Sequence, residues 1–242
     1  MNKMDNNYAA SFESTRRIEP RLWDSDYCQL RALADQVRSF AEEYVSPKST
    51  VLDIGCGAKP YEPLFPSTCR YIGIDMGDNP FAEISVGSDG QIPLEDGSGN
   101  ILISTQVVYL VENYLDYLSE CRRLIDSDGV MLMSTLGTWT YHPASGGDYY
   151  RFTQDGVRSI LGKAGFEVVS LVPIVGTLGT GLHLRQIVFN SWLRRLRLGL
   201  VANLLNMFYN LRIVIEDRMC PEGTRMAAPV AWSVIAKPVS NE

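Results

Sequence analysis

Histidine is scarce in this chain, and its cysteines show no paired spacing. The 242 residues include only two histidines, His142 and His183, and five cysteines without a C-x-x-C pair. An odd number of unpaired cysteines argues against a disulfide framework, and the shortage of ligands argues against a structural zinc site. We therefore expect reduced thiols and no bound metal.

An apolar leader is also missing at the N-terminus. Residues 1–8 are polar and lack the apolar core of a secretion signal, so we expect a cytoplasmic protein. The net charge of −6 disfavours nucleic-acid binding, because a basic surface normally supplies most of that affinity. Apolar residues make up 45% of the chain and charged residues 21%, which is typical of one globular domain with a sizeable core.

Acidic residues and lysine are absent between Val168 and Ile215. The charged residues of that segment are five arginines: Arg185, Arg194, Arg195, Arg197 and Arg212. The segment therefore carries +5, and the rest of the chain carries −11.

Two short motifs carry most of the functional information. The first, Val51-Leu-Asp-Ile-Gly-Cys-Gly-Ala58, is an apolar run that meets an acid and then two glycines one residue apart. The second, Tyr71-Ile-Gly-Ile-Asp75, is an apolar run that ends in an acid. Such runs are typical of buried parallel strands, and in doubly wound sheets an acid about 20 residues beyond the glycine turn holds a ribose. Asp75 stands at that distance from Gly55.

The glycine turn lacks the third glycine of dinucleotide sites. That glycine lets a helix pack closely and present its amides to a pyrophosphate. Here the positions after Gly57 read Ala58-Lys59-Pro60-Tyr61, and Asp53 would direct a carboxylate towards the phosphates. A ligand with a cationic or zwitterionic end fits better, which favours S-adenosylmethionine over a nicotinamide dinucleotide.

With these motifs the chain resembles the class I S-adenosylmethionine-dependent methyltransferases. Val51–Gly57 and Tyr71–Asp75 are similar to the first two motifs of that family. Three later stretches fall, in order, where the family has its third to fifth elements: Ser88–Asp96, Ile101–Gln106 and Leu124–Gly129. The similarity covers residues 48 to 172.

The resemblance implies S-adenosyl-L-methionine as the cofactor and a set of residues that bind it. The set is Asp53, Gly55, Cys56, Gly57, Asp75, Met76, Asp89, Gly90 and Gln106. Asp53 and the glycines would line the methionine and ribose portion, and Asp75 would take the ribose hydroxyls. Asp89 would meet the adenine amine, and Gln106 would stand near the methionine end. Many relatives carry a Glu-His pair after this point, where the chain has Tyr109 and Leu110, so a base cannot be assumed there.

We expect an α/β fold with a doubly wound, Rossmann-like sheet of seven strands. It is a single domain with four parts: an N-terminal cover helix in 1–47, the core in 48–175, a helical insert in 176–228, and the last strand and tail in 229–242. Apolar runs predict strands near 50–54, 70–74, 83–86, 100–104, 130–134, 167–173 and 229–237. Helical spacing predicts helices at 24–44 and 115–125, the second closed by Gly129, and a third that Thr153 caps and that ends at Lys163-Ala-Gly165.

The insert contains an amphipathic pattern over 194–215. Asn203, Asn206 and Asn210 share one face with Gly199, and a broad apolar face lies opposite. The polar residues argue against a membrane span. We expect the apolar face to pack on the sheet or on a second subunit of a homodimer. The alternative is that the arginines hold it against the inner face of an anionic membrane.

The stretch from Thr138 to Phe152 supplies the candidate acceptor site. It follows the fifth strand, at the carboxyl edge where open α/β sheets bind ligands. Histidine can accept a proton near neutral pH, so we take His142 as the base and Asp148 as the residue that orients it. Trp139, Tyr141, Tyr149 and Tyr150 would wall the acceptor pocket, and Arg151 and Phe152 would pin the loop.

Three functions remain open from the sequence. The first is O-methylation of a sugar, glycan or natural-product hydroxyl, because the segment from Tyr141-His-Pro143 to Tyr150–Thr153 resembles a branch of bacterial methyltransferases of envelope-polysaccharide and secondary-metabolite pathways. The second is N-methylation of a small amine, which needs a base less. The third is a cofactor-binding module without turnover, docked to a membrane or partner through 194–215.

Overall fold

One seven-stranded sheet forms the core of the protein. The computed structural model describes residues 14–143 and 147–239, so the ends of the regions 1–47 and 229–242 lie outside the described residues. The strands are β1 (Thr50–Ile54), β2 (Arg70–Met76), β3 (Ile84–Val86), β4 (Gly99–Thr105), β5 (Ile125–Leu136), β6 (Phe166–Ile174) and β7 (Ala231–Pro238). Their order is β3-β2-β1-β4-β5-β7-β6, and β7 alone runs antiparallel to its neighbours. All seven strands that the sequence predicts are present.

The central strands are buried on both faces, which explains their continuous apolar runs. Val51 pairs with Tyr71 of β2 on one side and with Ile101 of β4 on the other. In this register β1, β2 and β4 end side by side, so the residues that follow them meet at the carboxyl edge of the sheet.

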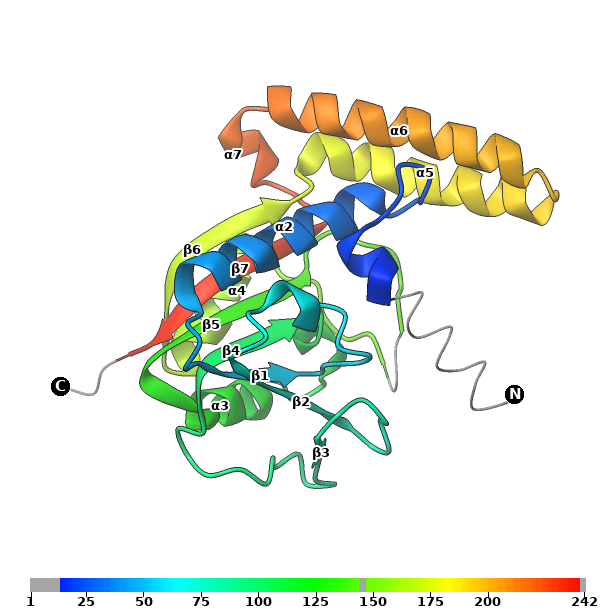
Figure 1. Cartoon of the computed structure of the whole chain (residues 1–242). Coiled ribbons are helices and arrows are strands. Elements are labelled where there is room, and N and C mark those ends of the chain that lie inside the picture. Colours follow the sequence, from blue (N-terminus) through cyan, green and yellow to red (C-terminus); the bar gives the residue numbers. More distant parts are fainter. Residues whose placement is uncertain (1–13, 144–146, 240–242) are drawn as a thin grey trace.

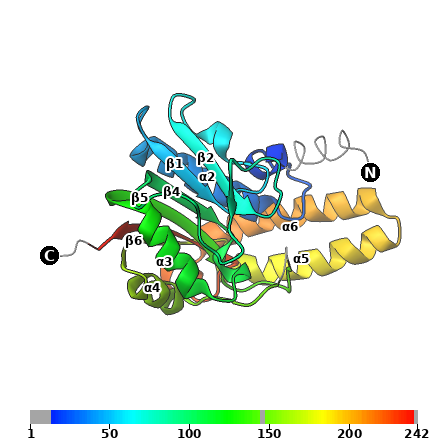
Figure 2. The same cartoon turned by 90° about the horizontal axis from the view of Figure 1, so that it is seen from below.

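Helices cover both faces of the sheet. Figures 1 and 2 show α2 (Tyr27–Tyr44) on one face and both α3 (Tyr114–Leu124) and α4 (Gln154–Lys163) on the other. The hydroxyl of Thr153 accepts the Gly156 amide at 3.1 Å, which confirms the predicted cap. The connection after β1 contains the 3-10 turn η1 (Glu62–Leu64), and the connection after β4 contains the 3-10 turn η2 (Val108–Leu110) before α3.

Gly129 does not close α3 as the sequence suggests. The chain enters β5 directly at Ile125, whose backbone is extended. A side chain at Gly129 would lie 3.0 Å from the carbonyl of Asn100, so close packing against the neighbouring strand accounts for this glycine.

The insert between β6 and β7 is a helical hairpin, not one amphipathic helix. It comprises α5 (Thr177–Arg195), a turn at 196–198, α6 (Gly199–Met219) and the short α7 (Glu222–Arg225). Arg197 adopts a left-handed φ of 59°, which breaks the helix within the predicted 194–215 stretch. No helix in the described part of the chain is long and apolar enough to cross a membrane.

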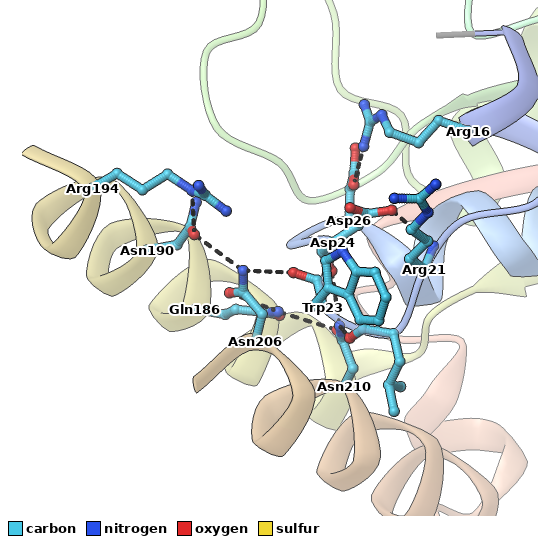
Figure 3. Close-up of polar contacts among 11 residues, drawn as sticks. Arg16, Arg21, Trp23, Asp24, Asp26, Gln186, Asn190, Arg194, Asn206 and Asn210 are labelled. Atoms are coloured by element: carbon cyan, nitrogen blue, oxygen red, sulfur yellow. Dashed lines mark hydrogen bonds and ion pairs between the residues drawn. The ribbon is translucent and has the colours of Figure 1, made fainter. Parts of the chain in front are cut away.

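The polar face of α6 points inward, and this overturns the expectation that its apolar face packs on the sheet. Asn206 and Asn210 are fully buried. Asn210 donates to the carbonyls of Leu22 and Asp24 at 2.7 and 2.8 Å, and Asn206 donates to the carbonyl of Trp23 at 3.0 Å (Figure 3). The asparagines therefore join the hairpin to the segment before α2, and the apolar residues on the opposite side of α6 face solvent.

Candidate functional site

The glycine turn after β1 is held against the end of β2. The amides of Gly55 and Cys56 both donate to the carbonyl of Ile74, at 2.8 and 3.1 Å. Gly55 and Gly57 have φ values of 76° and 54°, which favour glycine. A side chain at Gly55 would collide with Val107, whereas the space beside Gly57 is open. The turn thus leaves room for a ligand next to Gly57, and the Cys56 side chain is buried away from it.

Asp75 brings the two sequence motifs together. One carboxylate oxygen accepts the Gly57 amide at 2.9 Å and the Asn79 side-chain amide at 2.7 Å, and the other accepts the Met76 amide at 2.8 Å. An ionised carboxylate can accept about four hydrogen bonds, so it retains capacity for a ligand hydroxyl. Asn79 was not found from the sequence, although its place in the turn Gly77-Asp-Asn-Pro80 is a usable signal.

Asp53 is buried at the end of β1 beside this turn. The Tyr71 hydroxyl donates to one of its oxygens at 2.6 Å, and the other oxygen has no hydrogen-bond partner in the described structure. Burial raises the pKa of Asp53 to about 7. An orphaned carboxylate oxygen in such a place fits a cationic ligand group, because a positive charge would offset its desolvation.

Gln106 follows β4 in a left-handed conformation, with a φ of 60°. Its backbone amide donates to the carbonyl of Ser134 on β5 at 3.0 Å, and its side-chain nitrogen lies 3.2 Å from the Ser134 hydroxyl. Left-handed residues other than glycine cost about 1–3 kcal/mol and concentrate at functional sites. The turn therefore holds Gln106 at the carboxyl edge, between β4 and β5.

The remaining predicted cofactor residues are exposed. Met76 ends β2 with 64% of its surface exposed. Asp89 and Gly90 lie in the turn after β3, where the Asp89 carboxylate accepts the Gln91 amide at 3.1 Å. The described contacts give Asp89 no bond to the glycine turn, and its adenine role stays a prediction.

The loop after β5 is fixed by Asp148 and Arg151. The Asp148 carboxylate pairs with the Arg151 guanidinium and accepts the backbone amide of His142 at 2.7 Å. Arg151 lowers the pKa of Asp148, and Arg151 also donates to the carbonyls of Thr140 and Tyr150, at 2.7 and 2.8 Å. The predicted loop-pinning role of Arg151 is confirmed. Asp148 thus holds the His142 backbone, and among the described contacts the Asp148 carboxylate forms no hydrogen bond with the His142 imidazole.

The aromatic residues of this loop do not converge on one wall. Trp139 packs edge-on against His183 of α5, with ring centroids 4.8 Å apart. Tyr149 and Tyr150 are anchored through their amides on the carbonyl of Tyr109, whereas Tyr141 is 77% exposed. The backbone of Tyr109 thus supports the loop after β5.

A cavity of about 350 Å³ lies elsewhere, between α2, the end of β6 and α6. Its lining includes Arg31, Asp217 and Arg225 but none of the predicted site residues. Arg225 pairs with Asp217 there, so the charges of this cavity are largely paired within the fold.

The strand order, with its reversed last strand, and the acid-bearing carboxyl edge define the class I S-adenosylmethionine-dependent methyltransferase fold. Residues 52–133 match the family model of a methyltransferase domain. A relative from Mycolicibacterium smegmatis (strain ATCC 700084 / mc(2)155), named a probable S-adenosylmethionine-dependent methyltransferase, is 28% identical over 133 residues. That match covers 49% of this chain and 52% of the relative, so the chain matches about half of the relative's length.

Solved structures of low identity share the fold. The [4+2]-cyclase SpnF gives a TM-score of 0.55 at 13% identity, over 87% of this chain and 82% of that one. A Burkholderia thailandensis 1,6-didemethyltoxoflavin-N1-methyltransferase with bound S-adenosylhomocysteine gives 0.53 at 11%, over 99% and 92%. Residues 52–133 are thus similar to a methyltransferase domain, and the solved structures share the fold of the chain.

Proposed function

We propose that the protein transfers a methyl group from S-adenosylmethionine to a hydroxyl of a small acceptor, such as a sugar, glycan or natural product, in the cytoplasm. One observation supports the choice of cofactor: the Asp75 carboxylate accepts the Gly57 amide at the open turn, and Asp53 nearby has a carboxylate oxygen without a hydrogen-bond partner. When bound, the cofactor supplies an electrophilic methyl carbon on a positively charged sulfur.

The chain's residues provide the binding and orientation that this chemistry requires. Asp75 would accept hydrogen bonds from the ribose hydroxyls, and Asp53 would offer a negative charge to the cationic methionine end. Gln106 would lie near the methionine end, and Asp89 with Gly90 would contact the adenine. Alignment of acceptor and methyl carbon can lower the barrier by about 7–11 kcal/mol, so precise positioning is the main contribution of the protein.

His142 is the proposed base for a hydroxyl acceptor. Its side chain is exposed after β5, and its backbone is fixed by Asp148, which Arg151 keeps ionised. The imidazole would take the proton of the acceptor hydroxyl as its oxygen receives the methyl group, and the bound cofactor would supply that methyl group with a neutral thioether as the leaving group. Trp139, Tyr141 and Tyr149 would contact the acceptor.

Replacement of His142 tests this chemistry. With radiolabelled methyl donor and a panel of sugars, phenols and amines, His142→Ala should lower the turnover of hydroxyl acceptors about a hundredfold or more at neutral pH, because general-base catalysis is worth about 10²–10⁴. Binding of S-adenosylhomocysteine should be unchanged by calorimetry. Thr140→Ala is the matched control, since it changes an exposed neighbour of His142 that contacts Arg151 through its backbone carbonyl.

Amine methylation is the second candidate, because a neutral amine can attack through its nitrogen lone pair without first losing a proton and so needs His142 less. Turnover confined to amines, or a His142→Ala variant as fast as the parent on hydroxyls, would reject the base assignment.

A cofactor-binding module without methyl transfer is the third candidate, since the shared fold also occurs in a [4+2]-cyclase. Tight binding of S-adenosylhomocysteine with no transfer to any acceptor class would favour it.

A further inference from the structure

The hairpin of α5 and α6 carries many apolar residues on its outer side. The large apolar residues that are exposed on the hairpin are Leu178, Val188, Phe189, Trp192, Leu196, Leu198, Leu200, Val201, Leu204, Phe208, Leu211, Ile215 and Met219. On α6 they occupy the side opposite the buried Asn206 and Asn210. A helix of a globular protein normally has the reverse arrangement, and an apolar surface of this extent marks an interaction site.

The inward position of the polar side is fixed by hydrogen bonds. Besides their bonds to the segment before α2, the asparagines meet Gln186 of α5, whose side-chain amide donates to Asn210 at 3.1 Å. Rotating α6 to bury its apolar side would break this buried network (Figure 3). The outward apolar face is therefore a property of the folded hairpin.

Cations without acidic partners accompany this apolar face. Arg185, Arg194, Arg195 and Arg197 are exposed, and none of them forms an ion pair in the described structure. Arg194 donates instead to the side chains of Asn190 and Asn203. Arg212 is the exception, since it pairs with Glu216. Three of the unpaired arginines lie within four residues of one another at the end of α5.

The turn of the hairpin projects from the sheet. Figures 1 and 2 both show the free ends of α5 and α6 extending beyond the strands. Trp192, Leu196, Leu198 and Leu200 surround this turn together with the arginines. α5 begins three residues after β6 ends, and its His183 packs against Trp139 of the loop after β5.

We propose that the projecting end of this hairpin docks onto an anionic lipid bilayer. Trp192 and the leucines would enter the interface between headgroups and acyl chains, and the arginines would meet lipid phosphates. A second copy of this chain is a poorer occupant, because a two-fold contact brings the same arginines against each other without acids to offset them. This proposal does not depend on the proposed function.

Vesicle flotation with the full chain tests the proposal. The protein should float with vesicles that contain about 30% phosphatidylglycerol and detach as salt rises, and it should stay unbound with phosphatidylcholine alone. The combined change Arg194→Ala, Arg195→Ala and Arg197→Ala should weaken partitioning about a hundredfold, since each arginine near the surface contributes about 1 kcal/mol. The matched control, Arg70→Ala with Arg158→Ala and Lys163→Ala, removes the same charge elsewhere and should bind as the parent does.

A second pair of variants tests the apolar part. Trp192→Ser with Leu200→Ser should abolish flotation, whereas Leu115→Ser with Val169→Ser, which changes exposed apolar residues away from the hairpin, should not. Unchanged thermal melting checks that each variant folds. The proposal is overturned if the parent fails to float, if it binds neutral vesicles equally, or if both charge variants lose binding alike. It is also overturned if light scattering shows a dimer that the Trp192 variant dissociates while vesicles leave the parent unbound.

Discussion

Asp53 occupies the environment least suited to a charge among the residues of the candidate site. Its carboxyl group is buried at the end of β1, one oxygen bonded by Tyr71 and the other without a partner. Burial raises its pKa to about 7, against an ordinary value of 3.8. A buried carboxyl group in this position costs stability, and a cationic ligand group bound beside it would offset that cost.

The raised pKa predicts how stability depends on pH. Between about pH 4 and 7 the folded protein keeps a proton that the unfolded chain has lost, so the free energy of unfolding falls as pH rises through this window. Asp53→Asn removes this dependence. Its melting temperature relative to the parent should therefore be several degrees higher at pH 8 than at pH 5, measured by thermal melts at both values. The same variant should bind S-adenosylmethionine more weakly. An equal difference at both pH values would contradict the assignment.

The helical hairpin depends on a few buried polar bonds for its attachment. Asn210 is fully buried and bonds the carbonyls of Leu22 and Asp24, whereas Asn203 is half-buried and its partner in the described structure is the exposed Arg194. The two asparagines lie on the same helix, but only one joins it to the body of the protein.

These positions predict unequal costs of substitution. Asn210→Ala removes two hydrogen bonds to partly buried carbonyl groups and the buried bond to Gln186, and it should lower the free energy of unfolding by about 2–4 kcal/mol. Asn203→Ala should cost less than about 1 kcal/mol, because its bond is exposed. Urea unfolding of both variants measures the difference. Similar values for the two would mean that the buried network does not hold the hairpin.

At the scale of the whole molecule, the core could be predicted from the sequence because buried parallel strands leave a strong local pattern. The continuous apolar runs located all seven strands, and Thr153 marked the start of α4. The glycine turn and Asp75 were predicted together because residues after adjacent parallel strands meet at one edge. Asn79 was not predicted, because its hydrogen bond to Asp75 depends on how the turn after β2 folds back.

The helical hairpin and the loop after β5 were less predictable. Periodicity identified the two faces of the 194–215 pattern, but periodicity alone does not say which face points inward. That choice depends on carbonyl groups near Trp23, more than 180 residues away in sequence. Likewise, the pairing of Asp148 with Arg151 instead of the His142 imidazole depends on loop geometry that residue types leave open.

The central claim is that the carboxyl edge of β1 and β2 holds an adenosyl ligand through Asp75. Calorimetric titration with S-adenosylhomocysteine tests it most directly. Asp75→Ala should weaken binding about 10- to 100-fold, because a charged hydrogen bond to the ribose contributes about 1.5–3 kcal/mol. Asp78→Ala, which changes an exposed acid three residues away, should bind as the parent does. Absence of binding to the parent, or equal affinity of the parent and the Asp75 variant, would contradict the account.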